Sequence, residues 1–270
     1  MNTNNKIVKL ITLSDKKMKM KDIFSIKGKV IIITGGGNGI GHNLSLNMAD
    51  EGAFVYSIDI KFSKTKKDKF LFQENCDITD FEKFGKVCNK IFKKHKKIDV
   101  LINCAGISLA EQKPNKIYPI EKWISTLNVN LTAAFNCSQT VINYMIKNST
   151  GSIINITSIA AEQGFPRNPA YSASKGGLKV LGKSLAKDWG RFGIRVNNLG
   201  PGFIKTDITK QRYNNKKTRK HREELTLLQR WGEKDDLLGP CIFLSSDASK
   251  FMTGQDLYID GGWLTNSGIE

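Results

Sequence analysis

The stretch that decides the fold is KVIIITGGGNGIG, residues 29–41. Its first half is a run of β-branched and apolar side chains that predicts a buried strand. Its second half spaces Gly35, Gly39 and Gly41 at the start of a predicted helix over residues 39–51. Glycines let the backbone approach a pyrophosphate, which a helix N-terminus binds through its free N–H groups and its dipole. The stretch therefore predicts a dinucleotide site where the strand ends. Its spacing, Gly-x-x-x-Gly-x-Gly, differs from the general fingerprint Gly-x-Gly-x-x-Gly, but its glycines would act by the same mechanism.

The next predicted strand indicates which dinucleotide is bound. It covers residues 53–58 and is followed by Asp59, eighteen residues beyond Gly41. A carboxylate there accepts hydrogen bonds from ribose hydroxyls and repels the 2′-phosphate of NADP. Lys61 lies two residues further and weakens that exclusion. We therefore expect NAD rather than NADP as the cofactor.

A second group of residues has the chemistry of proton transfer. Tyr171 follows Ser158 by thirteen residues, and Lys175 follows Tyr171 by four. On a helix, this spacing places the phenol and the ammonium on one face. A free tyrosine keeps its proton until about pH 10, but a fixed cation favours the phenolate and allows proton exchange near neutrality. Such a pair also arises by chance in a lysine-rich helix, so the rest of the chain has to decide between a reaction centre and surface decoration.

The whole chain alternates between predicted strands and helices. The strands are expected over residues 29–34, 53–58, 70–76, 98–103, 151–158, 194–199 and 256–260, and the helices over 39–51, 80–96, 119–147, 169–190 and 235–246. Near-continuous apolar strands are typical of a parallel sheet buried on both faces, with a ligand crevice at the carboxyl ends of the strands. The predicted fold class is therefore α/β: a doubly wound (Rossmann) parallel seven-stranded sheet with helices on both faces, forming a single domain over residues 27–270. Its crevice would gather Asp59, Asn103, Ser158 and Gly200.

From about Lys27 onward, the chain resembles the short-chain dehydrogenase/reductase family. The segments that carry the resemblance are residues 34–41, 76–78, 103–106, 128–130, 158, 171–175, 201–202 and 260–262. One departure is Cys104, since members usually carry Asn-Asn-Ala-Gly where this chain has Asn-Cys-Ala-Gly. Residues 22–29, 230–233 and 258–264 are also similar to those of sugar-acid dehydrogenases, such as gluconate 5-dehydrogenases and deoxygluconate dehydrogenases.

The resemblance implies hydride transfer between nicotinamide and a secondary alcohol or ketone, and it implies a role for each site residue. Tyr171 would exchange the hydroxyl proton, Ser158 would hold the substrate oxygen, and Lys175 would bind the nicotinamide ribose and lower the tyrosine pKa. Asn130 would kink its helix and hold a water in a proton relay. The implied cofactor-binding residues are Gly35, Asn38, Gly39, Ile40, Gly41, Asp59, Asp77, Ile78, Asn103, Ala105, Gly106, Tyr171, Lys175, Pro201, Gly202, Ile204 and Thr206.

The net charge of +17 suggests an anionic partner. Three basic clusters contribute, at Lys64–Lys69, Lys93–Lys97 and Lys216–Arg222. No aromatic side chains interleave with them as a nucleic-acid stacking platform requires, so no specific nucleic-acid binding is expected. The third cluster belongs to a basic lid near residues 203–230 that would overhang the substrate pocket. We expect a small anionic substrate, with Arg167 and the lid as candidate clamps.

Composition bounds the remaining classes. Residues 1–26 are expected to form a partly disordered extension without a secretory signal, and no apolar run of about 18 residues predicts a membrane-spanning helix. Five dispersed cysteines indicate a reducing cytoplasm, and three scattered histidines indicate no metal site. The family resemblance implies a homotetramer or homodimer. Two alternatives stay open: a 3-oxoacyl-[acyl-carrier-protein] reductase-type NADPH enzyme of the same family, and a non-catalytic NAD-binding regulator.

Overall fold

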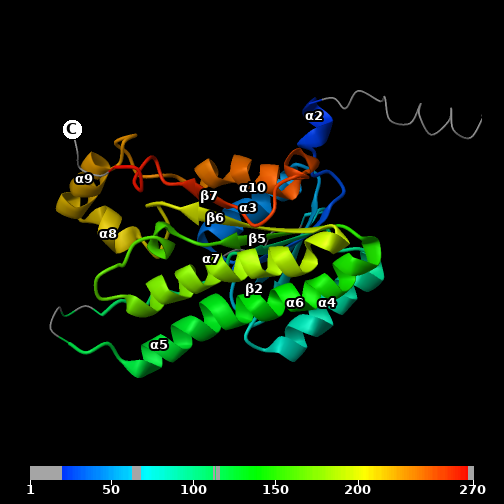
Figure 1. The fold of residues 1–270 in the computed structure, drawn as a ribbon, viewed down its shortest axis with the longest axis horizontal. Coiled ribbons are helices and arrows are strands. Elements are labelled where there is room, and N and C mark those ends of the chain that lie inside the picture. The colour runs from blue at the N-terminus through cyan, green and yellow to red at the C-terminus, as the bar shows by residue number, and fades with distance from the viewer. Residues whose placement is uncertain (1–19, 63–67, 112, 114–115, 267–270) are drawn as a thin grey trace, which may run out of the picture.

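The centre of the molecule is a seven-stranded parallel sheet in the order β3-β2-β1-β4-β5-β6-β7 (Figure 1). The structure, a computed structural model, describes residues 20–62, 68–111, 113 and 116–266. The strands are β1 (Val30–Thr34), β2 (Phe54–Asp59), β3 (Leu71–Asn75), β4 (Val100–Asn103), β5 (Gly151–Ile156), β6 (Ile194–Pro201) and β7 (Asp256–Ile259). The strand order reverses between β1 and β4, which is where such sheets bind ligands. The predicted doubly wound sheet is confirmed, with strand ends that shift by one or two residues.

Helices cover both faces of the sheet (Figure 1). On one face lie α3 (Gly39–Asp50) and α10 (Leu238–Ser245), and on the other lie α4 (Phe81–His95), α6 (Ala133–Met145) and α7 (Pro169–Trp189). Alternate residues of β1 serve the two faces: Ile31 and Ile33 pack with α3 and α10, whereas Val30 and Ile32 pack with the other group. A strand that is buried on both faces needs an apolar side chain at every position, which explains the unbroken run in the sequence.

The helix predicted over residues 119–147 is interrupted. It consists of α5 (Ile120–Leu127), a π-helical turn over Asn128–Thr132, α6, and a 3-10 turn over Ile146–Asn148. The side chain of Asn130, inside the π turn, exchanges two hydrogen bonds with the backbone of Ile107. A π turn accommodates one residue more than an α turn and is frequent at functional sites. The interruption falls at Asn130, where the family resemblance implies a kink in the helix.

Two helices that periodicity did not predict lie between β6 and α10. They are α8 (Lys210–Asn214) and α9 (Lys216–Leu225), at one end of the molecule (Figure 1). The sequence of α9 is KKTRKHREEL, which has no apolar stripe to signal a helix. A side-chain cap starts it instead, because Asn215 accepts a hydrogen bond from the N–H of Thr218 at 3.0 Å.

The described N-terminal segment packs against the core. The short helix α2 (Met20–Ile23) precedes Phe24, whose ring lies 6.2 Å from that of Phe243, and Ile26 is 2% exposed. Residues 1–19 of the predicted extension, and Lys64, Lys66 and Lys67 of the first basic cluster, lie outside the described residues. Among the helices that are described, none combines the length and the apolar character that crossing a membrane requires.

Candidate active site

A row of hydrogen-bonded polar side chains joins strands β4, β5, β6 and β7. Asn103 of β4 donates to Asn155 of β5 at 3.0 Å, Asn155 donates to Asn198 of β6 at 3.0 Å, and Asn198 donates to Asp256 of β7 at 2.7 Å. Asn103 also donates to Ser138. Buried polar groups that are paired in this way hold one arrangement of the strands. The row buries the side chain of Asn103 among these partners, and the cofactor contact that the family resemblance implies for this residue stays a prediction.

The glycine turn after β1 forms a cradle that tolerates no side chains. A Cβ atom on Gly35 would lie 2.6 Å from the Cα atom of Ala105, and one on Gly37 would lie 2.0 Å from the carbonyl oxygen of Lys61. Asp59, at the end of β2, accepts hydrogen bonds from the N–H groups of Gly37 at 2.9 Å and Lys61 at 3.2 Å. The carboxylate that would meet the adenosine ribose is therefore fixed beside the turn, as a dinucleotide site requires.

The predicted adenine-side residues follow β3. The side chain of Asp77 accepts hydrogen bonds from the N–H and the hydroxyl of Thr79, at 2.8 and 2.7 Å. Ile78 is buried in the core, and the N–H of Cys76 donates to the carbonyl oxygen of Asp59 at 2.9 Å. This last bond brings the segment to the end of β2, next to the glycine turn.

The start of the lid lies against the N-terminus of α3. Asn38 caps α3 by accepting from the N–H of Gly39 at 2.7 Å, and its side-chain nitrogen donates to Asp207. A Cβ atom on Gly39 would lie 3.9 Å from Thr206. Ile40 packs against the core cluster beneath α3. The helix N-terminus that would bind a pyrophosphate is thus bridged to the lid.

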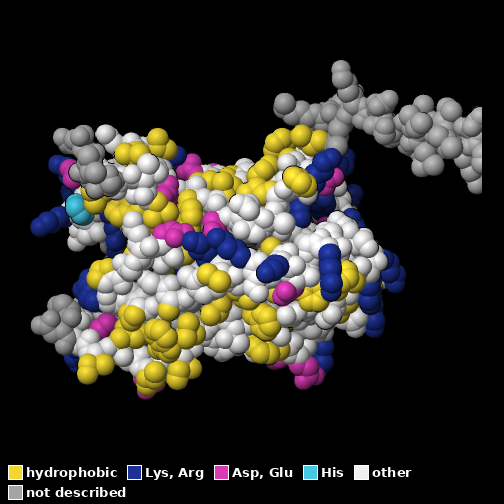
Figure 2. All heavy atoms as spheres, in the orientation of Figure 1, with side chains coloured by type: hydrophobic (Ala, Val, Ile, Leu, Met, Phe, Trp, Pro, Cys, Tyr) yellow, Lys and Arg dark blue, Asp and Glu magenta, His cyan; other side chains and the backbone are white. Residues whose placement is uncertain are grey.

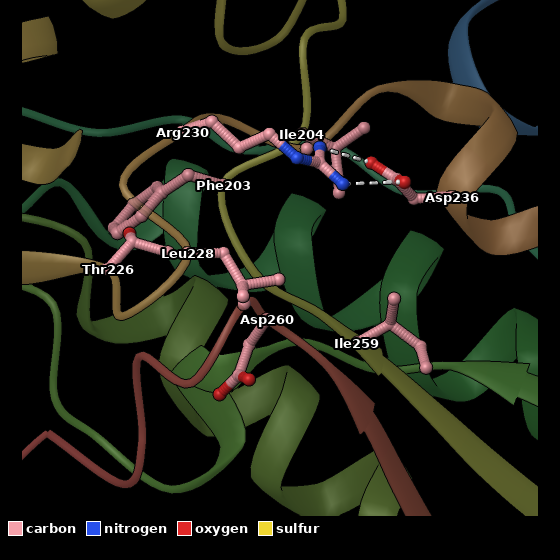
Figure 3. A pocket seen from close by; sticks show the side chains of 10 residues that line it. Phe203, Ile204, Thr226, Leu228, Arg230, Asp236, Ile259 and Asp260 are labelled. Carbon is pink, nitrogen blue, oxygen red and sulfur yellow. Dashed lines mark hydrogen bonds and ion pairs between the residues drawn. The ribbon is translucent and has the colours of Figure 1, made fainter.

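The base of the lid joins the last two strands. Gly202, after Pro201, donates from its N–H to the carbonyl oxygen of Ile259 at 2.9 Å, and Ile204 forms a parallel bridge with Gly232. A cavity of about 180 Å³ lies behind this bridge (Figure 3). Arg230 closes one side of it by a bidentate ion pair with Asp236 at 2.7 and 2.9 Å. The residues that line it include neither Tyr171 nor Lys175, so this cavity is separate from the proton-transfer group.

Ser158, Tyr171 and Lys175 come together at the carboxyl end of β5. Ser158 is the extended residue before a 3-10 turn at Ile159–Ala161, and its hydroxyl accepts from the N–H of Ala160 at 3.0 Å. The same hydroxyl lowers the pKa of the Tyr171 phenol. Lys175 is 4% exposed, and its ammonium donates to the carbonyl oxygen of Ile156 at 2.7 Å. The Lys175 Nζ atom lies 5.8 Å from the centre of the Tyr171 ring. The structure therefore brings the three predicted residues into one group.

The electrostatics of this group differ from the sequence-based expectation. Burial raises the pKa of Tyr171, while the hydrogen bond with Ser158 and the positive charge of Arg212 in α8 act in the opposite direction. Burial also lowers the pKa of Lys175 to about 8. Arg212, which the sequence analysis did not single out, is a cation that lowers the pKa of Tyr171. The same role for Lys175 stays a prediction.

Asn130 connects the group to the loop after β4. Its side-chain oxygen accepts from the N–H of Ile107 at 2.8 Å, and its nitrogen donates to the Ile107 carbonyl at 2.9 Å and to the hydroxyl of Ser174 at 3.1 Å. A Cβ atom on Gly106 would lie 3.3 Å from the Asn130 side chain and 3.6 Å from Lys175 Nζ. Asn130, Gly106 and Lys175 therefore share one wall. Within the residues that the structure describes, no group of His, Cys, Asp or Glu could hold a metal ion.

An aromatic cluster that the sequence analysis missed lies under the lid. The ring of Phe203 lies 6.2 Å from Phe165, 5.6 Å from Trp231 and 4.7 Å from Trp263. The guanidinium of Arg222 lies 4.0 Å from the centre of the Phe203 ring. One signal in the sequence could have indicated this cluster, because three of its aromatic residues stand directly beside a glycine. Phe203 follows Gly202, Trp231 precedes Gly232 and Trp263 follows Gly262.

Comparison with known proteins agrees with this geometry. The family model described as Enoyl-(Acyl carrier protein) reductase matches residues 35–264. The 2-dehydro-3-deoxy-D-gluconate 5-dehydrogenase of Bacillus subtilis is 36% identical over 253 residues, covering 91% of this chain and 98% of the relative. The 3-oxoacyl-[acyl-carrier-protein] reductase of Thermotoga maritima is 36% identical over 251 residues, covering 88% and 98%.

Solved structures show the same likeness. A gluconate 5-dehydrogenase from Burkholderia cenocepacia J2315, in complex with NADP and tartrate, superposes with a TM-score of 0.83 at 30% identity, covering 90% of this chain and 98% of that one. The doubly wound sheet and its glycine turn are those of an oxidoreductase that binds a nicotinamide cofactor. With these relatives, the chain belongs to the short-chain dehydrogenase/reductase family.

Proposed function

We propose that this protein interconverts a secondary alcohol and a ketone on a sugar acid, with NAD as its cofactor. The observation that carries the proposal is the grouping of Ser158, Tyr171 and Lys175 at the carboxyl end of β5, in a chain whose glycine turn and Asp59 form a dinucleotide cradle. The sugar acid is supported by the printed names of the Bacillus and Burkholderia relatives and by the basic lid.

Each residue has a defined role in this proposal. When bound, the nicotinamide supplies the acceptor or donor of the hydride. Tyr171 takes the hydroxyl proton during oxidation and returns it during reduction, and Ser158 hydrogen-bonds the same substrate oxygen. Lys175 holds the nicotinamide ribose hydroxyls. Because the Asn130 side chain is engaged by Ile107 and Ser174, its backbone carbonyl would hold the water of the relay.

The preference for NAD rests on the fixed position of Asp59. Two backbone N–H groups hold its carboxylate beside the glycine turn, so a 2′-phosphate would meet an anion that cannot turn away. The remaining contacts are proposed along the same cleft, at Gly35, Asn38, Gly39, Ile40, Gly41, Asp77, Ile78, Ala105, Gly106, Pro201, Gly202, Ile204 and Thr206. We also propose a cytoplasmic location, since all five cysteines are free thiols in the structure.

A substrate panel tests the proposal. Sugar acids, the matching polyols and simple keto acids are offered with NAD or NADP (reduced forms for the ketones), and turnover is followed by the absorbance of the reduced nicotinamide. We expect turnover of at least one sugar acid with a higher kcat/KM for NAD than for NADP. Efficient turnover of polyols and none of the acids would contradict the substrate class. Tight NADH binding without turnover on any substrate would contradict the enzymatic role.

A second candidate is reduction of 3-oxoacyl thioesters carried by an acyl carrier protein. The observations that favour it are the 36% identity to the Thermotoga reductase and the net charge of +17, which suits an acidic carrier. The position of Asp59 disfavours the NADPH that this function would use. A higher kcat/KM for acyl thioesters with NADPH than for any sugar acid with NAD or NADH would establish this candidate in place of the first.

A further inference from the structure

Arg222, in the last turn of α9, has a guanidinium that lies among aromatic rings. Its central carbon lies 4.0 Å from the centre of the Phe203 ring and 5.5 Å from that of Trp231. The Nη1 atom is buried and has no hydrogen-bond partner among the described residues. A buried donor that is left unpaired costs free energy, and more so when it belongs to a charged group. An acceptor that reaches this nitrogen would remove that cost.

The acidic residues of the lid do not supply that acceptor. Glu223 lies 3.8 Å from Arg219, and Glu224 lies 3.7 Å from Lys220. Arg222 instead has a second cation nearby, since burial and the positive charge of Arg212 together lower the pKa of Arg222 to about 10. Both side chains are half-buried. Two guanidinium groups that act on each other in this way form a region of positive potential that favours an anion.

Two observations relate the arginines to the reaction centre. The charge of Arg212 acts on the Tyr171 phenol, so α8 reaches the same cleft. Phe203, beneath Arg222, follows Pro201 and Gly202 and stacks on Phe165, which lies in the loop after Ser158. An anion held there would be attached to a molecule whose other end lies near the phenol.

The backbone around Arg222 is fixed from two directions. Thr226 donates from its hydroxyl to the carbonyl oxygen of Arg222 at 2.7 Å, and the Trp231 indole donates to the carbonyl oxygen of Arg219 at 3.5 Å. The last turn of α9 is thereby tied to the aromatic cluster. A guanidinium whose stem is held in this way loses little side-chain entropy when it binds an anion.

We propose that Arg222, assisted by Arg212, binds the carboxylate of the substrate and selects sugar acids over the matching polyols. The inference rests on the proposed function and deepens it, because it assigns the acid specificity to two residues of the lid. A guanidinium binds a carboxylate through two parallel N–H···O bonds, and the unpaired Nη1 provides one of the donors. Arg212 adds charge at the side that faces Tyr171.

Calorimetric titration of the NADH-bound protein tests this assignment without requiring turnover. D-Gluconate and D-glucitol are compared, since both are six-carbon polyhydroxy chains and the first carries a carboxylate. We expect gluconate to bind the wild type and Arg222→Met to weaken it by about 30-fold or more, because one partner of a partly desolvated charge pair is removed. Glucitol binding and NADH affinity should stay within about twofold of the wild type on the same scale.

Three further variants separate a specific contact from a general field. Lys220→Met removes the same charge from the same helix at a side chain that is 80% exposed, and should leave gluconate affinity unchanged. Arg222→Lys keeps the charge but not the fork, and should fall between the wild type and Arg222→Met. Arg212→Met should weaken gluconate and keep glucitol, which preserves the test if Arg222→Met fails to fold.

The outcomes discriminate between the proposals. Equal gluconate affinity in the wild type and both Arg→Met variants, equal losses for gluconate and glucitol, or an equal loss in Lys220→Met would each overturn the carboxylate clamp. Arg222-dependent binding of inorganic phosphate, with no gluconate binding, would overturn it in favour of a phosphate site. Arg222-dependent gluconate binding without sugar-acid turnover leaves the clamp standing and refutes the proposed function. If the protein turns over sugar acids and neither Arg222→Met nor Arg212→Met changes that turnover, the proposed function stands and the clamp is refuted.

Discussion

At the scale of single residues, the surroundings of Tyr171 oppose the chemistry proposed for it. Burial raises the pKa of the phenol, and the hydrogen bond with Ser158 and the charge of Arg212 offset this only in part. Burial of Lys175 lowers its pKa, so its ammonium is also disfavoured in the protein alone. A positively charged nicotinamide in the same low-dielectric cleft would favour the phenolate, which makes proton transfer dependent on cofactor binding.

Replacing Tyr171 by Phe tests the proton-transfer role. The variant keeps the ring and loses the hydroxyl, so kcat should fall by about 10²–10⁴, the usual contribution of a positioned acid or base. NADH affinity should be unchanged, because the ring still lines the cleft. Steady-state assays measure kcat, and titration with NADH measures its affinity. Tyr144→Phe in α6 is the matched control. Turnover near the wild-type level would remove Tyr171 from the mechanism.

The pKa of Lys175 predicts a pH dependence of stability. The group has a pKa of about 8 when folded and about 10.4 when unfolded, so between these values the unfolded chain binds the extra proton. Stability contributed at this site should therefore rise with pH through that window, by up to about 1.4 kcal/mol per pH unit. Below pH 8 the cost of burying the ammonium is present in full. Urea unfolding of the wild type and of Lys175→Met should give parallel stability profiles below that pH, and the wild type should gain stability relative to the variant above it. Profiles that stay parallel through the whole window would show that the ammonium is not desolvated.

At the scale of elements, the sequence could predict features that one segment determines by itself, and it could not predict features that depend on contacts between distant segments. The unbroken apolar run of β1 belongs to one strand, and the spacing of Gly35, Gly39 and Gly41 belongs to one turn, so both could be read from the sequence. The clash that a side chain at Gly37 would meet with Lys61 depends on contact with the segment after β2, so it could not. The lid helices were not, since α9 is polar on every side and is stabilised by a cap and by contact with Trp231. Likewise, nothing in the sequence near Asn103 shows that its amide faces Ser138 and Asn155.

The π turn between α5 and α6 carries the next prediction. Asn130→Ala removes both hydrogen bonds to Ile107 and the one to Ser174, and it leaves the buried backbone groups of Ile107 without these partners. The free energy of unfolding should fall by about 2–4 kcal/mol, since each unpaired buried group costs about 1–3 kcal/mol. Denaturant unfolding measures the loss. Asn128→Ala, an exposed residue of the same turn, is the control and should change stability by less than about 0.5 kcal/mol.

At the scale of the whole molecule, charge and apolar surface are separated. The net charge of +17 includes the basic helix α9, whose Glu223 and Glu224 are paired with Arg219 and Lys220. The apolar surface gathers over α5 (Figure 2). Ile120 and Ile124 of α5 are each 60% exposed, and Val180 of the adjacent α7 is 63% exposed. Large apolar patches on a folded surface mark interaction sites. Together with the family resemblance, this supports a homodimer or homotetramer that packs through α5 and α7. Composition alone could not reveal this state, because the apolar residues of these helices would also suit a core.

Ile124→Glu tests that packing. If a second copy covers α5, burying the new carboxylate is costly and the assembly should dissociate by at least one step, for example from tetramer to dimer or from dimer to monomer. Light scattering coupled to size exclusion gives the mass of each species. Ile208→Glu, which introduces the same charge at a 58% exposed side chain before α8, should keep the wild-type mass. A monomeric wild type would mean that the complete active site belongs to one chain acting alone. An Ile124→Glu variant of unchanged oligomeric mass would mean that the copies pack through another face than α5.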